Sequence, residues 1–395
     1  MNNKILKLLL IIFLCFVPKY VVGVGDNGVN IGVDNIIEEQ LEKLNIKELQ
    51  SIIDNITKNN EQLLNKIDIL TYIKSLLKGE KIFSFEEVLN NLLILIFKEL
   101  IINSKLLGQI LILAILCAVL TNMQNAFESN TVGELAFYVC YMLLIAIAMK
   151  SFVVTMGLAN RAIDQMVLFM QALLPILITL LLAVGGITSA AIFKPIILGS
   201  VSIMSTLMKN VILPLIFFSA VIGIISKLSD KVQISKLSSV IRQITTTVLG
   251  MLLTVFLGIM SIHGVATSKL DGVTIKTAKF AVDSFIPIVG GFLSEAIDTV
   301  ISCSLLLKNA IGVIGLILIF MICVIPIVKI ISLILIYKFT TVVIEPISDS
   351  RIIQCLNEIT KSLLMIFAVI SSVGIMFFIA VTIIVGAGNI TTMLR

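Results

Sequence analysis

The sequence has few of the side chains from which enzyme and metal sites are usually built. It contains no tryptophan and one histidine, His263, and its six cysteines are scattered without a Cys-x-x-Cys pair. A zinc site needs several closely spaced sulfur or nitrogen ligands, and a disulfide framework needs regularly spaced cysteines. The sequence also lacks a Gly-x-Ser-x-Gly motif and a Walker motif. We therefore expect no catalytic residues, no cofactor and no metal, and predict that the protein is not an enzyme.

Charge is also scarce, since only 13% of the residues are charged and 58% are hydrophobic, whereas soluble domains have about 25% charged residues. The charges crowd into the first hundred residues, and long stretches after residue 106 have none. The net charge of +5 does not indicate a nucleic-acid partner, because the basic residues lie singly between apolar runs. The lipid bilayer is the expected solvent for the larger part of the chain.

The first 24 residues have the composition of a signal peptide. Lys4 and Lys7 precede the apolar run Leu8 to Val17, and small side chains follow at about Gly23. The run is too short to cross a hydrocarbon core of about 30 Å as a helix, although an uncleaved anchor that starts further upstream remains an alternative. In either case residues 25–104 should lie outside the cytoplasm.

Residues 25–104 are predicted to form amphipathic helices. Apolar residues recur at helical spacing from Asp34 to about Thr57, with an interruption near Asn45. A capping box at Ser84 and Glu87 predicts another helix that ends at about Ile102. The segment is either a small cap on the membrane domain or a docking surface for an extracytoplasmic partner.

Residues 105–395 are predicted to be a multi-pass transmembrane domain. Backbone groups in lipid must be satisfied within their own segment, so apolar windows of about 20 residues indicate helices. The fold class is therefore all-α, a polytopic helical membrane protein with seven or eight spans. The candidate windows are 106–121, 135–158, 166–184, 195–226 as two spans broken around Lys209, Asn210 and Pro214, 247–265, a shorter pair within 285–307, 310–337 and 363–387. Arg161, Asp164 and Lys194 are interpreted as loop charges.

One stretch, from Asp283 to Leu307, has glycine, proline and acidic residues within its apolar sequence. We interpret it as a re-entrant or broken element, which lipid tolerates only where protein or a water-filled cavity covers the backbone. Ionisable residues in such places are candidates for function. The candidates for a polar path or a subunit seam are Lys279, Asp283, Glu295, Asp298 and Lys308. The alternative is that they are hydrated charges at helix ends.

The positive-inside rule gives an orientation. With the N-terminal segment outside, five crossings place Lys227, Lys231, Lys236 and Arg242 in the cytoplasm. The loop with Lys269, Lys276 and Lys279 would then face the exported side.

A weak internal repeat in the sequence indicates an alternative function. Strings with a Gly-Gly pair and a later Lys-Asn pair occur near Lys209 and again near Lys308. Internal repeats build midplane binding sites in secondary transporters. A stand-alone transporter of a small molecule, with its site near Glu295 and Asp298, is therefore the alternative function.

Several polar strings within the apolar chain resemble one known family. They are Asn103–Gly108, Gln124–Phe127 with Thr131 and Val132, Asp271–Phe280 (DGVTIKTAKF), Phe285–Gly290, Asp298–Ser302, Leu305–Asn309 and Ala387–Ile390 with Arg395. Together they resemble the stage III sporulation protein AE family of endospore-forming bacteria. The resemblance covers nearly the whole chain, and the one notable departure is Cys303, where a small residue is expected.

This resemblance implies a role in sporulation during engulfment, in the mother-cell membrane that surrounds the forespore. It implies a multi-pass membrane component of a channel or secretion-like complex, acting as a scaffold or conduit subunit. The implied partners are other stage III sporulation membrane proteins, among them a separate ATPase and ring-forming subunits, and indirectly a protein of the forespore membrane. The family has no established catalytic residues to carry over.

Overall fold

The computed structural model describes residues 37, 39–41, 44, 46–58, 68–77, 85–126, 131–227, 234–285 and 290–393, and within these ranges every regular element is a helix. The elements are α3 (Ile46–Lys58), α4 (Ile69–Leu77), α5 (Phe85–Ile102), α6 (Ser104–Ala126), α7 (Thr131–Ala183), α8 (Ile187–Leu207), the π-helical turn η1 (Met208–Ile212), α9 (Leu213–Ile225), α10 (Ser235–Phe285), α11 (Gly290–Ile344) and α12 (Ser350–Met393). The predicted all-α fold is confirmed.

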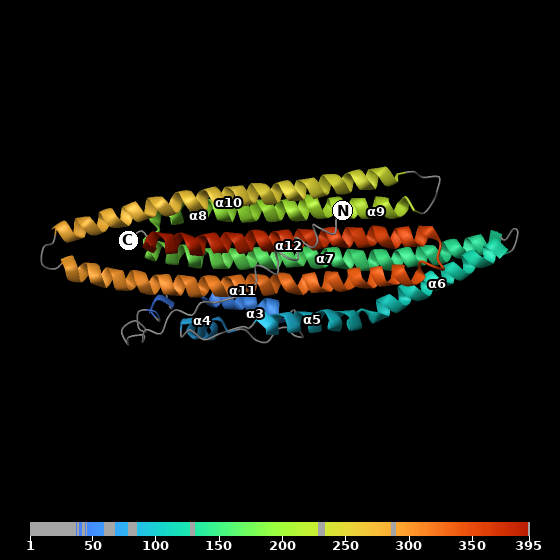
Figure 1. The fold of residues 1–395 in the computed structure, drawn as a ribbon, viewed down its shortest axis with the longest axis horizontal. Coiled ribbons are helices and arrows are strands. Elements are labelled where there is room, and N and C mark those ends of the chain that lie inside the picture. The colour runs from blue at the N-terminus through green and yellow to red at the C-terminus, as the bar shows by residue number, and fades with distance from the viewer. Residues whose placement is uncertain are drawn as a thin grey trace.

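The long helices lie side by side, each antiparallel to the one before it in the chain (Figure 1). The π turn joins α8 and α9 into one rod, so the bundle consists of α7, α8–α9, α10, α11 and α12, with α6 along α7. Gly185 makes the turn between α7 and α8 with φ 93°, a conformation that favours glycine. The turns after α6, α9 and α11 lie at one end of the bundle, and those after α7 and α10 lie at the other.

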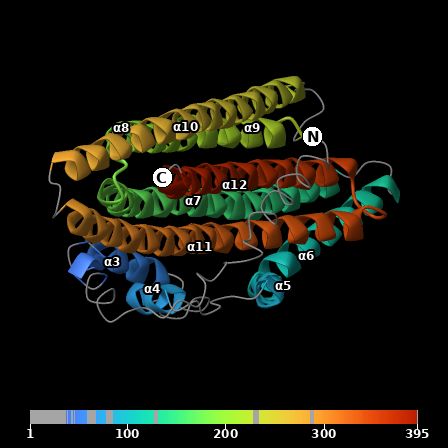
Figure 2. The same cartoon turned by 60° about the vertical axis from the view of Figure 1, so that its left-hand side comes forward.

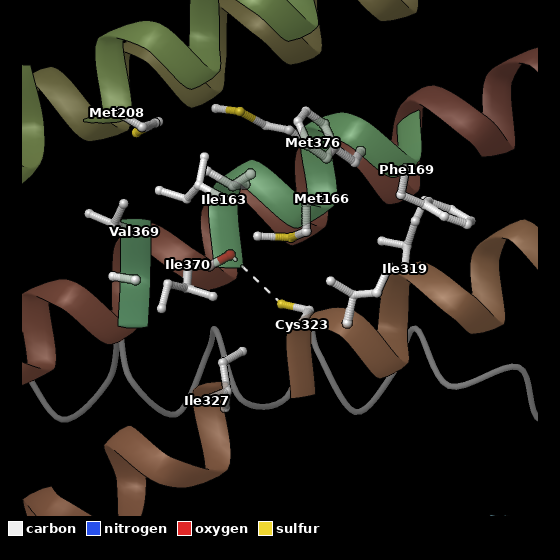
Figure 3. Close-up of a cluster of buried hydrophobic side chains, with 14 of the residues drawn as sticks. Ile163, Met166, Phe169, Met208, Ile319, Cys323, Ile327, Val369, Ile370 and Met376 are labelled. Atoms are coloured by element: carbon white, nitrogen blue, oxygen red, sulfur yellow. Dashed lines mark hydrogen bonds between the residues drawn. The ribbon is translucent and has the colours of Figure 1, made fainter. Parts of the chain in front are cut away.

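Apolar side chains fill the centre of the bundle, where α7, α11 and α12 meet. Met166 and Phe169 of α7 face Ile319 and Cys323 of α11 and Ile370 of α12 (Figure 3). The Cys323 thiol donates to the Ile370 carbonyl oxygen at 3.8 Å. All five cysteines among the described residues are free, and four of them are buried, as expected of cysteine used as a small hydrophobe.

Six helical rods among the described residues are long and apolar enough to cross a membrane, instead of seven or eight. The windows 135–158 and 166–184 belong to one helix, α7, and the windows within 195–226 form the single rod α8–α9. Of the predicted broken element, residues 283–285 end α10 and residues 290–307 begin α11, while residues 286–289 lie outside the described residues. The interpretation of Arg161, Asp164 and Lys194 as loop charges is wrong, because all three lie inside helices. A charged side chain on the outer face of a helix leaves its backbone hydrogen bonds intact.

The N-terminal helices pack against one side of the bundle (Figure 2). Helix α3 begins at the predicted interruption and buries Leu49 and Ile53, while α4 buries Ile69 and Ile73. The side-chain amide oxygen of Gln50 accepts from the Ile69 backbone N–H at 3.0 Å, which joins the two helices. This packing is consistent with the cap, and the docking surface stays a prediction. The predicted leader, residues 1–24, lies outside the described residues.

Candidate functional site

The predicted site residues come from two helices that meet at one end of the bundle. Lys279 and Asp283 lie one turn apart near the end of α10, and Glu295 and Asp298 lie one turn apart near the start of α11. The turn between these helices brings the four positions to the same end. The side chains of Lys279, Asp283 and Glu295 lie outside the part of the chain that the structure describes.

Lys308, another of the predicted site residues, lies in the interior of the bundle. It is fully buried in α11, and its Nζ atom donates to the backbone carbonyl oxygen of Val385 in α12 at 2.8 Å. A buried ammonium group is costly unless hydrogen bonds compensate for its lost water. We call this contact between α11 and α12, with the glycine contact at Gly312 one turn further along α11, the α11–α12 seam.

A residue of the N-terminal segment reaches this region and was not predicted as part of it. The side-chain amide of Gln40 donates to the Ser304 hydroxyl oxygen at 2.9 Å, and the Ser304 hydroxyl lies 3.2 Å from the amide oxygen of Gln40. Ser304 is fully buried one turn before Lys308. Sequence reasoning missed Gln40 because 264 residues separate it from Ser304, and a serine in an apolar run gives no signal of its partner.

A second polar cluster, also missed, joins α9, α10 and α12. Arg242 of α10 forms an ion pair with Glu358 of α12, and Lys361 donates to the other carboxylate oxygen at 2.9 Å. Gly223 of α9 leaves room for this carboxylate, because a Cβ atom there would lie 2.9 Å from the Glu358 Oε2 atom. Nearby, the Ser238 hydroxyl donates to the Ser219 carbonyl oxygen at 2.8 Å. The cluster fixes the mutual register of three helices.

A third polar cluster lies midway along the bundle. Lys209, in the π turn, forms an ion pair with Asp164 of α7, and Arg161 is exposed one turn before Asp164. Asn210 is exposed beside Lys209. We call Arg161, Asp164, Lys209 and Asn210 the polar girdle. A π turn displaces the following helix and often marks a functional site.

These clusters bind helices together, and their chemistry is that of ion pairs and hydrogen bonds. In the part of the chain that the structure describes, no group of three His, Cys, Asp or Glu side chains could hold a metal ion. The arrangement can position helices and present charge at defined levels of the bundle.

Comparison with known proteins matches the sequence of this chain to one family. A family model described as stage III sporulation protein AE matches residues 67–388. A curated relative, the stage III sporulation protein AE of Bacillus subtilis (strain 168), is 40% identical over 319 residues, which cover 81% of this chain and 80% of that protein. No solved structure matches the chain.

Proposed function

The chain belongs to the stage III sporulation protein AE family, and on that premise we propose that it is a membrane component of a channel or secretion-like complex between the mother cell and the forespore. Membership of the family implies a role in sporulation. In this proposal the chain is a scaffold or conduit subunit in the mother-cell membrane during engulfment. Its partners are a separate ATPase, ring-forming subunits and, indirectly, a protein of the forespore membrane.

The observation that carries the scaffold role is the filled interior of the bundle. Apolar side chains occupy the space where α7, α11 and α12 meet, and α11 approaches α12 closely at Gly312 and Gly374. Interiors packed in this way are stiff and transmit strain instead of yielding to a solute. A rigid bundle with charges at both ends and at its middle is suited to holding partners at fixed positions.

The experiment that tests the proposal is purification from sporulating cells, followed by a transport assay. A scaffold subunit should co-purify with other stage III sporulation membrane proteins and should move no solute when reconstituted alone in lipid vesicles. Transport by the purified chain alone would favour the alternative, a stand-alone secondary transporter. The two repeated Lys-Asn pairs give this alternative little support, because Lys209 lies in the polar girdle whereas Lys308 is buried in the α11–α12 seam.

Lys308→Met should lower the yield of heat-resistant spores without lowering the amount of protein in the membrane. Methionine keeps most of the side-chain volume but removes the hydrogen bond to Val385, and bonds to charged groups contribute about 1.5–3 kcal/mol. If this bond positions the last turns of α12 for a partner, the assembled fraction should fall about tenfold or more, since 1.4 kcal/mol is a factor of ten. The measurement is spore counting together with co-purification. Lys194→Met, on the exposed face of α8, is the matched control, and equal spore counts for the two variants would contradict a role for Lys308.

Glu295→Ala combined with Asp298→Ala should impair spore formation more than Lys194→Ala. The two acidic positions share one face near the start of α11, at the end of the bundle where α10 also ends. A surface contact made by such a pair would be lost with both carboxylates. Spore counts at matched protein levels test the prediction, and equal yields would remove these residues from the candidate site.

A further inference from the structure

The apolar helices are about twice as long as a bilayer requires. The apolar part of α7 has 49 residues and that of α11 has 47, which correspond to about 73 and 70 Å at 1.5 Å per residue. The hydrocarbon core of a bilayer is about 30 Å thick, and spanning helices tilt by 0–40°. Even at the upper tilt, one bilayer encloses little more than half of α7.

Two polar layers on α7 are separated by the thickness of one hydrocarbon core. At the first layer, the Tyr141 hydroxyl lies 3.2 Å from the carbonyl oxygen of Lys227, just after α9, and 3.3 Å from the carbonyl oxygen of Arg351, at the start of α12. The second is the polar girdle, which begins at Arg161. The twenty residues from Tyr141 to Arg161 span about 30 Å.

We propose that the hydrocarbon layer surrounds the bundle between the Tyr141 layer and the polar girdle, and that the girdle lies among the lipid headgroups of the outer leaflet. Arg161 and Lys209 offer two positive charges against one from Asp164, which suits lipid phosphate groups. The rest of the bundle projects into the exported compartment. From Asp164 to Ala183 the projection is 19 residues, or about 29 Å.

The N-terminal helices support this placement, because they lie on the projecting part and need water. The Gln40–Ser304 hydrogen bond places the N-terminal segment beside the first part of α11, and α3 and α4 lie along the same part of the bundle (Figures 1 and 2). Their outer faces carry exposed charges at Lys47, Glu48, Asp54, Asp68 and Lys74. Each charged side chain in the middle of a bilayer costs about 2.5–3.5 kcal/mol on insertion scales.

Helices α5 and α6 support it from the other half, because they need lipid. Helix α6 packs along the first part of α7 and exposes Ile112, Leu116 and Val119. The apolar end of α5 exposes Phe97 and Ile101 and lies beside the second half of α11, where the Ser332 hydroxyl donates to the Ile96 carbonyl oxygen at 3.4 Å. A membrane around this half keeps these exposed apolar side chains in lipid.

Several charges lie within the proposed layer and need water or protein around them. The contact between Ser151 and Tyr337 places the neighbouring Lys150 and Lys338 at one level, about nine residues or 14 Å from Tyr141. A lysine side chain is too short to reach the headgroups from this depth, so each ammonium group draws water or headgroups into the layer, at a cost of about 2.5–3.5 kcal/mol on insertion scales. The Arg242–Glu358 pair at a similar level is largely buried in protein.

Spin labels on one helix test the proposal without disturbing the core. Leu143, Val154, Leu168 and Leu182 are exposed apolar residues of α7, the first two inside the proposed layer and the last two beyond it. Each is replaced by cysteine in the full chain, with Cys140, the one partly exposed described cysteine, replaced by serine and the unlabelled background measured. The labelled proteins are reconstituted in phosphatidylethanolamine–phosphatidylglycerol vesicles. Frequent collision of a spin label with dissolved oxygen shows that the label lies in lipid, and frequent collision with a water-soluble nickel chelate shows that it lies in water.

We expect oxygen collisions to dominate at positions 143 and 154 and nickel collisions to dominate at positions 168 and 182. Any result in which positions 168 and 182 are not dominated by nickel overturns the projection. Nickel-dominated labels at 143 and 154 overturn it as well, in favour of the opposite half. The inference does not rest on the proposed function, and a failure here leaves the spore and co-purification tests unaffected.

Discussion

Glu358→Ala should lower the free energy of unfolding by about 3–5 kcal/mol, the cost typical of removing one partner from a buried ion pair. The side chains of Arg242 and Glu358 are only 15% and 13% exposed. Without the carboxylate, the Arg242 guanidinium would remain buried with no opposite charge, and its Nε atom already lacks a hydrogen-bond acceptor. The measurement is the midpoint of unfolding of the purified protein in mixed micelles with increasing sodium dodecyl sulfate.

Two further variants distinguish a missing partner from a general loss of packing. Asp164→Ala also removes the acidic partner of an ion pair, but that carboxylate is 51% exposed in the polar girdle. Exposed ion pairs contribute only about 0–1 kcal/mol to stability, so the unfolding midpoint of this control should lie close to that of the unmodified protein. The double variant Arg242→Met with Glu358→Leu removes both charges and should recover most of the lost stability. Equal midpoints for Glu358→Ala and Asp164→Ala would show that burial does not set the strength of these pairs.

The pattern of apolar residues in the sequence predicted the helices well and their connections less well. The start of α3 near Asn45 and the end of α5 at Ile102 were predicted from caps and periodicity, which are local properties. A loop was predicted at Arg161 and Asp164 because an unpaired charge is costly in lipid. The partner of Asp164 is Lys209, 45 residues away, and no local pattern shows such a distant pairing.

The candidate site shows the same division between local and distant information. Lys308 was found because a lysine in an apolar run is unusual, and the structure places it in the α11–α12 seam. Arg242 was interpreted as a flanking charge of the positive-inside rule, although its partner Glu358 lies 116 residues further on. A charge of opposite sign at a matching depth of another predicted helix is the signal that could have suggested this pair.

Gly312→Leu should destabilise the bundle by about 1–3 kcal/mol or more, the range for overpacking a filled core. A Cβ atom at Gly312 would lie 2.2 Å from the Cγ2 atom of Val385, the residue whose carbonyl oxygen accepts from Lys308. Valine is branched at Cβ and has few rotamers in a helix, so it cannot turn away without moving α12. The added side chain should therefore push α11 and α12 apart at the seam and at the same time break the hydrogen bond from Lys308 to Val385. The unfolding midpoint in mixed micelles and the spore count should both fall.

Gly250→Leu and Gly258→Leu, on α10, make the same substitution where nothing lies within 4 Å of an added Cβ atom. These controls also replace a helical glycine by leucine, which by itself improves helix propensity by somewhat less than 1 kcal/mol, so they should be neutral or slightly stabilising. Adding Val385→Ala to Gly312→Leu removes the two methyl groups that obstruct the new side chain and should restore part of the stability. If Gly312→Leu unfolds at the same midpoint as the two controls, then α11 and α12 are not in close contact at Gly312. The proposed positioning role of Lys308, which depends on its hydrogen bond to Val385 at this contact, would then be contradicted as well.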